Sequence, residues 1–394
     1  MAKEAKVRTE GASARSRRRA LWVIAAGVAV IAVAAGALLW LRLAGKGEAV
    51  IAARPETEAV AQSPLAEIAT AIGVDEDQCD HDSLRSEDAR IGGTPRGKSP
   101  VANPRGGFSL KFKDEVNPYT LMSTFVLPGE QLEIEAVFTD QPAKLEAKAE
   151  EGQLERLAAD RWRWTAPAKA GHYCIRVRDV AGDGSSCLNA FVMVPYRGEA
   201  TVNGYPIGRY QRQPLRGMAA YLMPVGLVEV DEESLGTWVS PHFQLGQFLC
   251  KQGGGFPKYV VLRTRLLLKL EMVLERLRER DIETDALFVM SGYRTPHYNA
   301  SIGNTTKYSR HSYGDAADVF VDRDGNGRMD DINGDGKSDL ADALVIYGML
   351  DELSADSWYQ QFEGGLGLYP PNPRFGPMVH TDTRGGKVRW KGAG

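Results

Sequence analysis

The chain has 394 residues, which is long for a single domain and predicts two or three. Its 48 basic and 51 acidic residues leave a formal net charge of −3, and no basic stripe indicates nucleic-acid binding. The apolar fraction of 43% is enough for a sizeable core, which excludes a largely unfolded chain.

The first feature along the chain is an apolar segment, Leu21–Leu41, that contains no charged residue. As a helix it would be about 30 Å long, the thickness of the hydrocarbon core of a bilayer. A basic tail at 1–20, which includes RSRRR at 15–19, should stay on the cytoplasmic side. We expect a single-pass anchor in the inner membrane, with the later domains periplasmic or otherwise extracytoplasmic. A cleaved signal peptide is the alternative, although its apolar run is normally about 7–15 residues.

The chain has four cysteines, Cys79, Cys174, Cys187 and Cys250, which would then lie in an oxidising compartment. None belongs to a CxxC pair, and this disfavours a zinc knuckle. Cys174 and Cys187 flank a predicted hairpin turn at 181–184 and can pair across it. Buried free thiols are the alternative.

Residues 44–105 are mixed in Pro, Gly, Ser and charge, which predicts a tether. From 106 to 197 the hydrophobic period becomes two, and Gly, Pro and Asp turns separate the apolar runs. The expected strands are Gln131–Phe138, Arg161–Pro167, His172–Asp179 and Leu188–Pro195. Short strands at this spacing predict an all-β sandwich, and the third of them resembles a late strand of immunoglobulin-like domains. We expect a spacer or docking module, with a protein partner as one use.

A joining segment at 198–239 leads to a region of mixed α+β pattern at 240–394. Apolar residues repeat at helical spacing over Tyr259–Asp281, with Lys and Arg between them, so we expect a helix there. Asp285–Met290 is typical of a buried strand, and Leu340–Leu353 predicts a second helix.

Two histidines and an aspartate in this last region suit a metal site. His311 and Asp318 are seven residues apart in HSYGDAAD, and His380 lies in MVHTD near the end of the chain. A catalytic zinc site uses three protein ligands of these types and keeps a fourth position open. The spacing alone is a weak pattern, since a single histidine is more often a hydrogen-bonded polar residue than a ligand.

Three sequence blocks strengthen the pattern because they occur in a fixed order. They are SGYRTPHYN (291–299), HSYGDAAD (311–318) and GGLGLYPPNPRFGPMVHTDTRGGKVRW (364–390). Together they resemble zinc D-alanyl-D-alanine peptidases, which share a fold with lysostaphin and hedgehog domains. The resemblance is to the branch of murein D,D-endopeptidases in particular. The segment SPHFQLGQFLC (240–250) resembles the opening of that branch. The resemblance covers about 240–390, under half of the chain.

The resemblance implies zinc ligands at His311, Asp318 and His380. It implies substrate-binding residues at Ser291, Tyr293 and Arg294. Arg294 would pair with a substrate carboxylate or a polarised carbonyl, because a guanidinium binds such oxygens in a forked geometry; a loop salt bridge is its alternative role. The implied substrate is peptidoglycan, cut in a stem peptide or cross-link at a bond following D-alanine, in cell-wall remodelling.

One position departs from the wider family. Carboxypeptidases and dipeptidases of this group carry a Glu general base three residues before the last histidine, where this chain has Pro377. Asp382 is the nearest carboxylate, as base or as the residue that orients His380, and a turn contact with nearby backbone is its alternative. His297 and Glu363 are weaker base candidates. Pro377 also supports a second hypothesis, a peptidoglycan-binding or regulatory protein that keeps the zinc fold without turnover.

The stretch at 322–342 is rich in Asp, Asn and Gly. DINGDGKSDLAD resembles the EF-hand-type loops of dockerins, with calcium ligands Asp331, Asn333, Asp335, Lys337, Asp339 and Asp342. A second, weaker set is Asp322, Asp324, Asn326 and Asp330. We expect a structural calcium loop inserted after the strand that carries Asp318. A solvated turn cluster is the alternative, because these residues favour turns. An adhesion or scaffold protein built on the sandwich and this loop is the third functional hypothesis.

Overall fold

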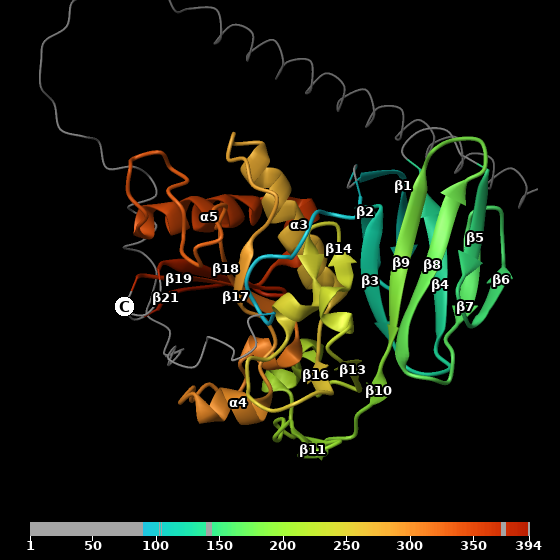
Figure 1. Cartoon of the computed structure of the whole chain (residues 1–394), viewed down its shortest axis with the longest axis horizontal. Helices are drawn as coiled ribbons and strands as arrows, with labels where there is room; N and C mark the ends of the chain where they lie inside the picture. Colours follow the sequence, from blue (N-terminus) through green and yellow to red (C-terminus); the bar gives the residue numbers. More distant parts are fainter. Residues whose placement is uncertain (1–89, 102, 104, 139–143, 372–375, 393–394) are drawn as a thin grey trace, which may run out of the picture. The chain divides into compact units, whose positions relative to one another are not determined.

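The computed structural model describes residues 90–101, 103, 105–138, 144–371 and 376–392. These residues form a mixed α+β structure, mostly β-sheet with few helices (Figure 1). In these ranges no helix has the length and apolar character needed to cross a membrane. The predicted basic tail, the anchor at Leu21–Leu41 and Cys79 lie outside the described residues.

The segment predicted as a sandwich forms two sheets that lie one over the other (Figure 1). The first has the order β2 (Glu115–Tyr119), β1 (Arg105–Phe112), β4 (Gln131–Val137), β7 (Arg161–Thr165) and β6 (Gln153–Arg156). The second has the order β3 (Leu121–Val126), β9 (Ser185–Val192), β8 (Gly171–Asp179) and β5 (Leu145–Ala149). The period of two buries alternate side chains, among them Trp162 and Trp164. The four predicted strands are confirmed as β4, β7, β8 and β9.

The described residues include three of the four cysteines, and two of these are paired. Cys174 on β8 and Cys187 on β9 form a disulfide, which is the pairing expected across the hairpin. Cys250 is buried and free.

The predicted joining segment is folded, and it belongs with the C-terminal region. Its strand β13 (Gly226–Val230) pairs with β10 (Val194–Pro195) and with β16 (Lys258–Val260). Two small hairpins belong to the same part of the chain, β11 (Thr201–Val202) with β12 (Tyr205–Pro206) and β14 (Trp238–Ser240) with β15 (Phe243–Gln244). Short 3-10 helices occupy Leu215–Gly217, Ala219–Tyr221, Ser234–Gly236 and Leu245–Phe248.

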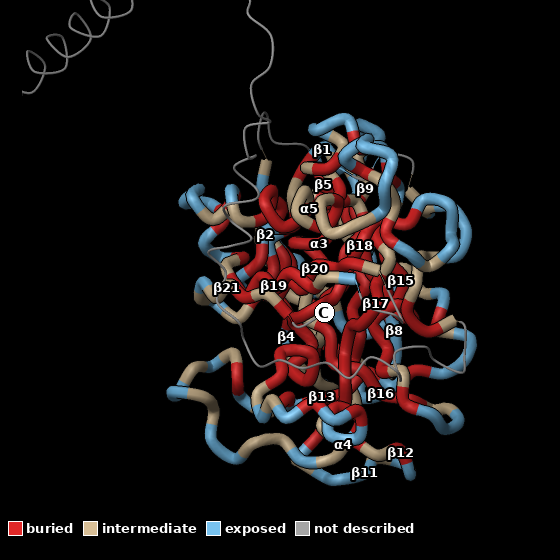
Figure 2. The backbone as a smooth tube through the Cα atoms, turned by 90° about the vertical axis from the view of Figure 1, so that its left-hand side faces the viewer, coloured by how far each residue is buried: buried red, intermediate tan, exposed pale blue. Residues whose placement is uncertain are grey.

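A second five-stranded sheet carries the candidate site. Its order is β17 (Phe288–Ser291), β18 (Ala316–Phe320), β20 (Met378–Asp382), β19 (Gly365–Tyr369) and β21 (Val388–Lys391). β18, β19 and β20 are buried along their whole length (Figure 2). Helix α5 (Leu340–Leu353) packs against β19 and β20 and contacts α3 (Thr264–Arg278). Helix α4 (Pro296–Ser301) lies between β17 and β18 in the chain, and a last 3-10 helix spans Ser357–Phe362.

One predicted helix is shorter than predicted at both ends, since α3 ends at Arg278 and not at Asp281, and the other has the predicted bounds. Helix α3 begins at Thr264, not at Tyr259, because residues 258–260 are held as a strand by β13. Helix α5 spans Leu340–Leu353, as predicted, because Asp339 and Asp342 form a capping box at its start.

The predicted tether does not extend to residue 105. Ile91 is buried, and Gly93 pairs with Val289 of β17. The backbone N–H of Arg96 donates to Oε1 of Gln244 at 2.9 Å, and Ser99 Oγ donates to the carbonyl oxygen of Pro241 at 2.7 Å. These contacts place 90–101 on the C-terminal region, an arrangement that the polar composition of the segment concealed.

The sandwich contacts the C-terminal region directly. Ser123 Oγ on β3 donates to the carbonyl oxygen of Val239 at 2.7 Å, and Thr264 Oγ1 donates to the carbonyl oxygen of Ser123 at 2.8 Å. Arg265 and Glu115 form an ion pair at 2.7 Å. The start of α3 is thus braced by the sandwich.

Candidate metal centre

A single row of residues crosses the C-terminal sheet at the level of the candidate ligands. Ser291 lies opposite Asp318, and Asp318 lies opposite His380. The row continues through Gly367 to Trp390. Directly opposite residues in a sheet present their side chains to the same face. Asp318 and His380, 62 residues apart in sequence, are therefore neighbours by strand register alone.

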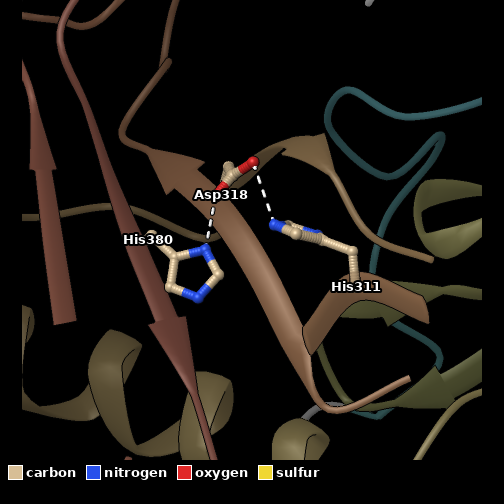
Figure 3. Close-up of side chains that lie close together, drawn as sticks. All are labelled: His311, Asp318 and His380. Atoms are coloured by element: carbon tan, nitrogen blue, oxygen red, sulfur yellow. Dashed lines mark hydrogen bonds and ion pairs between the residues drawn. The ribbon is translucent and has the colours of Figure 1, made fainter. Parts of the chain in front are cut away.

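The three predicted ligands lie together (Figure 3). Nε2 of His311 is 3.3 Å from Oδ2 of Asp318, and Nδ1 of His380 is 2.8 Å from Oδ1 of Asp318. All three side chains are buried, with 2%, 1% and 1% of their residue surface exposed. The structure thus brings together the three residues that the motifs singled out, in a group that could hold a metal ion.

His311 reaches the group from a short 3-10 helix, Arg310–Tyr313, that comes just before β18. Gly314 ends this helix with a φ of 72°, and a Cβ there would overlap the carbonyl group of Val261. The Nδ1 of His311 lies 2.7 Å from the carbonyl oxygen of Gly292. A carbonyl only accepts, so Nδ1 carries the proton and the lone pair of Nε2 faces Asp318.

His380 is held on its other nitrogen by Asp382. Nε2 of His380 is 3.2 Å from Oδ2 of Asp382, so the imidazole presents Nδ1 to Asp318 and Nε2 to Asp382. Arg384 forms an ion pair with the same carboxylate at 2.6 Å, and the backbone N–H of Gly365 donates to this carboxylate at 2.9 Å. A carboxylate on the outer nitrogen of a ligand histidine is a recurrent feature of metal sites, because it fixes the ring orientation and the tautomer.

The electrostatics differ between the two histidines. Burial lowers the pKa of His311, and the neighbouring charge of Arg294 lowers it further. Burial also disfavours the charged form of His380, but its bonds to Asp318 and Asp382 raise its pKa to about 9. Burial alone would raise the pKa of Asp318, yet the two histidines and Arg294 hold it well below its usual range. A metal ion entering this group would displace the Nδ1 proton of His380.

The donor set has the ligand types and roughly the spacing of a site for a metal ion with three protein ligands. Ligand atoms at about 2.0–2.1 Å from a tetrahedral ion lie about 3.3 Å from one another. The separations from Asp318 are 3.3 Å to His311 and 2.8 Å to His380. Two imidazole nitrogens and one carboxylate oxygen, buried and on rigid elements, match a three-ligand site.

The predicted substrate-binding residues are turned inward. Arg294 donates from Nη2 to Asp318 at 2.7 Å and from Nε to Ser291 Oγ at 2.8 Å. The hydroxyl of Tyr293 is 2.9 Å from that of Tyr210. All three predicted residues are at most 5% exposed, so the expected substrate contacts are not accessible in this structure. For Arg294 the alternative role, a salt bridge, is the one observed.

The base candidates are placed differently from one another. The carboxylate of Asp382 is fully buried and occupied by His380, Gly365 and Arg384, and Arg384 and His380 hold its pKa well below its usual range despite burial. The expected turn contact is also present, with the N–H of Arg384 at 3.0 Å. This geometry favours the orienting role over the base role. His297 is exposed on α4, and Oε2 of Glu363 is buried with no hydrogen-bond partner among the described residues.

The acidic stretch divides into two similar turns, and the weaker predicted set is the one gathered by the structure. The carboxylates of Asp322, Asp324 and Asp330 offer atoms within 4.8 Å of one another. In the second turn Asp342 instead accepts from the backbone N–H groups of Ile332 and Asp339. The second turn, predicted as the stronger site, stays a prediction, and its last carboxylate, Asp342, caps the start of α5.

Three contributors to the site were missed in the sequence: the carbonyl of Gly292, the side chain of Arg384 and the indole of Trp390 beside His380. The ring centroids of Trp390 and His380 are 4.9 Å apart. A signal for Arg384 existed, since His380, Asp382 and Arg384 follow one another at the period of a strand face. The carbonyl of Gly292 had no sequence signal, because any residue has one.

Comparisons of this chain with protein-family models, with curated proteins and with solved structures find no match. The function is therefore inferred from the site and from the motifs that pointed to it.

Gly367 makes room for Trp390 in the row. A Cβ on Gly367 would overlap the Trp390 indole, whereas one on Gly386, in the turn before β21, would meet nothing within 4 Å. Gly367→Ala is therefore expected to lower the free energy of unfolding by about 1–3 kcal/mol. Chemical denaturation measures this, with Gly386→Ala as the matched control. Equal stability of the two variants would show that the row is not tightly packed.

Proposed function

We propose that this protein is a zinc-dependent peptidase that cuts peptidoglycan stem peptides or cross-links at a bond following D-alanine. The observation that carries the proposal is the buried group of His311, Asp318 and His380, with a lone pair of His311 facing the carboxylate. The substrate class comes from the resemblance of 240–390 to murein peptidases. The predicted anchor would place the site outside the cytoplasm, where peptidoglycan lies.

Each residue has a defined task in this proposal. Bound zinc would supply a Lewis acid that polarises the scissile carbonyl and activates water near neutral pH. Gly292 and Asp382 orient the two histidines from behind, so that each presents one nitrogen to the centre. Arg294, fixed by Ser291 and Asp318, keeps a positive charge beside the donor set. That charge helps to hold the pKa of Asp318 well below its usual range, so that the carboxylate stays ionised as a ligand.

A second candidate is a peptidoglycan-binding or regulatory protein without turnover. Two observations favour it. Pro377 stands where carboxypeptidases and dipeptidases of the group that the motifs resemble carry a Glu base, and Asp382, the carboxylate nearest to His380 in the sequence, is saturated with hydrogen bonds. The intact ligand group favours the peptidase.

The experiment uses the full-length chain, purified in detergent, zinc-loaded and incubated with cross-linked muropeptides. Chromatography and mass spectrometry follow the products. Loss of cross-linked dimers would identify an endopeptidase, and loss of a terminal D-alanine would identify a carboxypeptidase. No turnover with about one zinc bound per chain would reject the peptidase and support the binding protein.

We also propose that the turns at 322–342 bind calcium with a structural role. The carboxylates of Asp322, Asp324 and Asp330 provide the hard oxygen ligands that calcium prefers. The turns join the end of β18 to the start of α5, so a bound cation would hold the strand of Asp318 and this helix in place.

Calcium is expected to raise the melting temperature of zinc-saturated protein. Calcium at about 100 times its Kd would stabilise the fold by about 2.7 kcal/mol. Asp324→Asn should remove most of the shift, and Asp356→Asn, an exposed aspartate beyond α5, should keep it. Thermal unfolding with and without chelator measures the effect. An unchanged melting temperature would leave the stretch as a solvated turn cluster.

A further inference from the structure

A small polar cavity of about 240 Å³ lies against the 3-10 helix that carries His311. One wall is α4, a second is the loop at 304–307, and a third is Arg209–Gln211 from the predicted joining segment. The remaining lining residues, Ser312 and Tyr313, directly follow His311 in the chain. The cavity is therefore lined in part by the helix that carries His311, while none of the three candidate ligands lines it.

The charge of this cavity is one-sided. Arg209 and Lys307 are both exposed lining residues, and no aspartate or glutamate lines the cavity. Within the described part of the chain neither cation forms an ion pair with a carboxylate. Two cations without a counter-charge favour an anionic ligand, and a carboxylate is the anion that a peptide offers.

A buried acceptor completes the cavity. Asn299 on α4 lines it, is 6% exposed, and its Oδ1 has no hydrogen-bond partner among the described residues. An unpaired buried amide oxygen costs free energy unless a ligand donates to it. A carboxylate together with a neighbouring N–H is the chemistry of one end of a peptide.

One hydrogen bond links a wall of the cavity to the segment 292–294, which contacts two of the candidate ligands. The hydroxyl of Tyr210, a wall of the cavity, lies 2.9 Å from that of Tyr293. In the chain Tyr293 lies between Gly292 and Arg294. The carbonyl oxygen of Gly292 accepts from His311, and Arg294 pairs with Asp318. Since Arg294 is committed to Asp318 and only 1% exposed, a substrate carboxylate needs other cations.

We propose that this cavity binds a free carboxylate of the substrate peptide, through Arg209 and Lys307, and the adjacent N–H through Asn299. The inference rests on the proposed function, because that function supplies the peptide whose carboxylate would bind here. The volume lies below the about 300–1,000 Å³ of sites that take a whole drug-sized ligand, which suits one terminal residue of the peptide. The carboxylate can come from the C-terminal D-alanine or from the side chain of a diamino diacid in the stem peptide.

The test measures binding by calorimetry, using the full-length, zinc-loaded chain. The first ligand is an acetylated peptide that ends in D-Ala–D-Ala with a free carboxylate. The second is its C-terminal amide, and the third is an amidated stem peptide with one free diaminopimelate carboxylate. The variants are the double substitution Arg209→Ala with Lys307→Ala, its charge-retaining form Arg209→Lys with Lys307→Arg, and the control Arg212→Ala. Arg212 is exposed on the same segment and does not line the cavity.

Loss of one charge-assisted contact corresponds to about tenfold in Kd or more. We expect the double alanine variant to weaken binding of a carboxylate peptide at least tenfold, and Arg212→Ala and the charge-retaining form to change it little. A loss confined to the first peptide assigns the C-terminal carboxylate, and a loss confined to the third assigns the side chain. Equal affinities of parent and double variant, or no binding of any peptide by the parent, would overturn the inference. Hydrolysis is followed in the same samples, so binding without turnover would reject the proposed peptidase and retain the carboxylate site.

Discussion

Replacement of His311 by alanine is expected to remove both the bound zinc and the peptidase turnover. His311 contributes a neutral imidazole whose Nε2 faces Asp318, and among the described residues only one other histidine, His380, belongs to the group. Loss of a ligand should exceed the about 10–100-fold effect that removal of an outer partner has on metal affinity. Zinc content by mass spectrometry under native conditions and muropeptide turnover give the two measurements.

The control for this variant is His172→Ala. His172 is an exposed histidine on β8 of the sandwich and should leave zinc and turnover unchanged. Circular dichroism establishes that each variant is folded. A folded His311→Ala protein that still binds one zinc per chain with parental affinity would show that the metal is held elsewhere.

Asp382→Asn is expected to be the most destabilising of the isosteric substitutions in the site. It removes the charge that pairs with Arg384, whose side chain is 17% exposed, and with His380. Removing one partner of a buried ion pair costs about 3–5 kcal/mol, because the other charge stays buried. Chemical denaturation measures the loss, and the exposed Asp285→Asn should stay within about 0.5 kcal/mol of the parent.

The same variant separates the two roles predicted for Asp382. If Asp382 only orients His380, zinc affinity should fall about 10–100-fold and much of the turnover should return at saturating zinc. If it accepts the proton from water, turnover should stay lost with the site full. Turnover measured across a zinc titration decides between them, and recovery is the expected outcome from the geometry of its carboxylate.

Local patterns predicted the elements whose causes are local. The strands β4, β7, β8 and β9 follow from alternation, since one face of each is buried against the opposite sheet. The bounds of α5 follow from its capping residues. Local patterns could not predict the start of α3. Residues 258–260 have helical apolar spacing, but they form a strand because they pair with β13, which is distant in sequence.

By itself the sequence determined which residue types could form a metal site, because His311, Asp318 and His380 are a chemically complete donor set in any fold that joins them. Only the tertiary structure decided how they are joined. Strand register put Asp318 opposite His380, and hydrogen bonds that Gly292 and Asp382 accept selected one nitrogen of each histidine. It also turned Arg294 inward and laid residues 209–211 beside α4. The physical reason is that register, burial and hydrogen-bond partners are set by long-range pairing, which no local sequence pattern encodes.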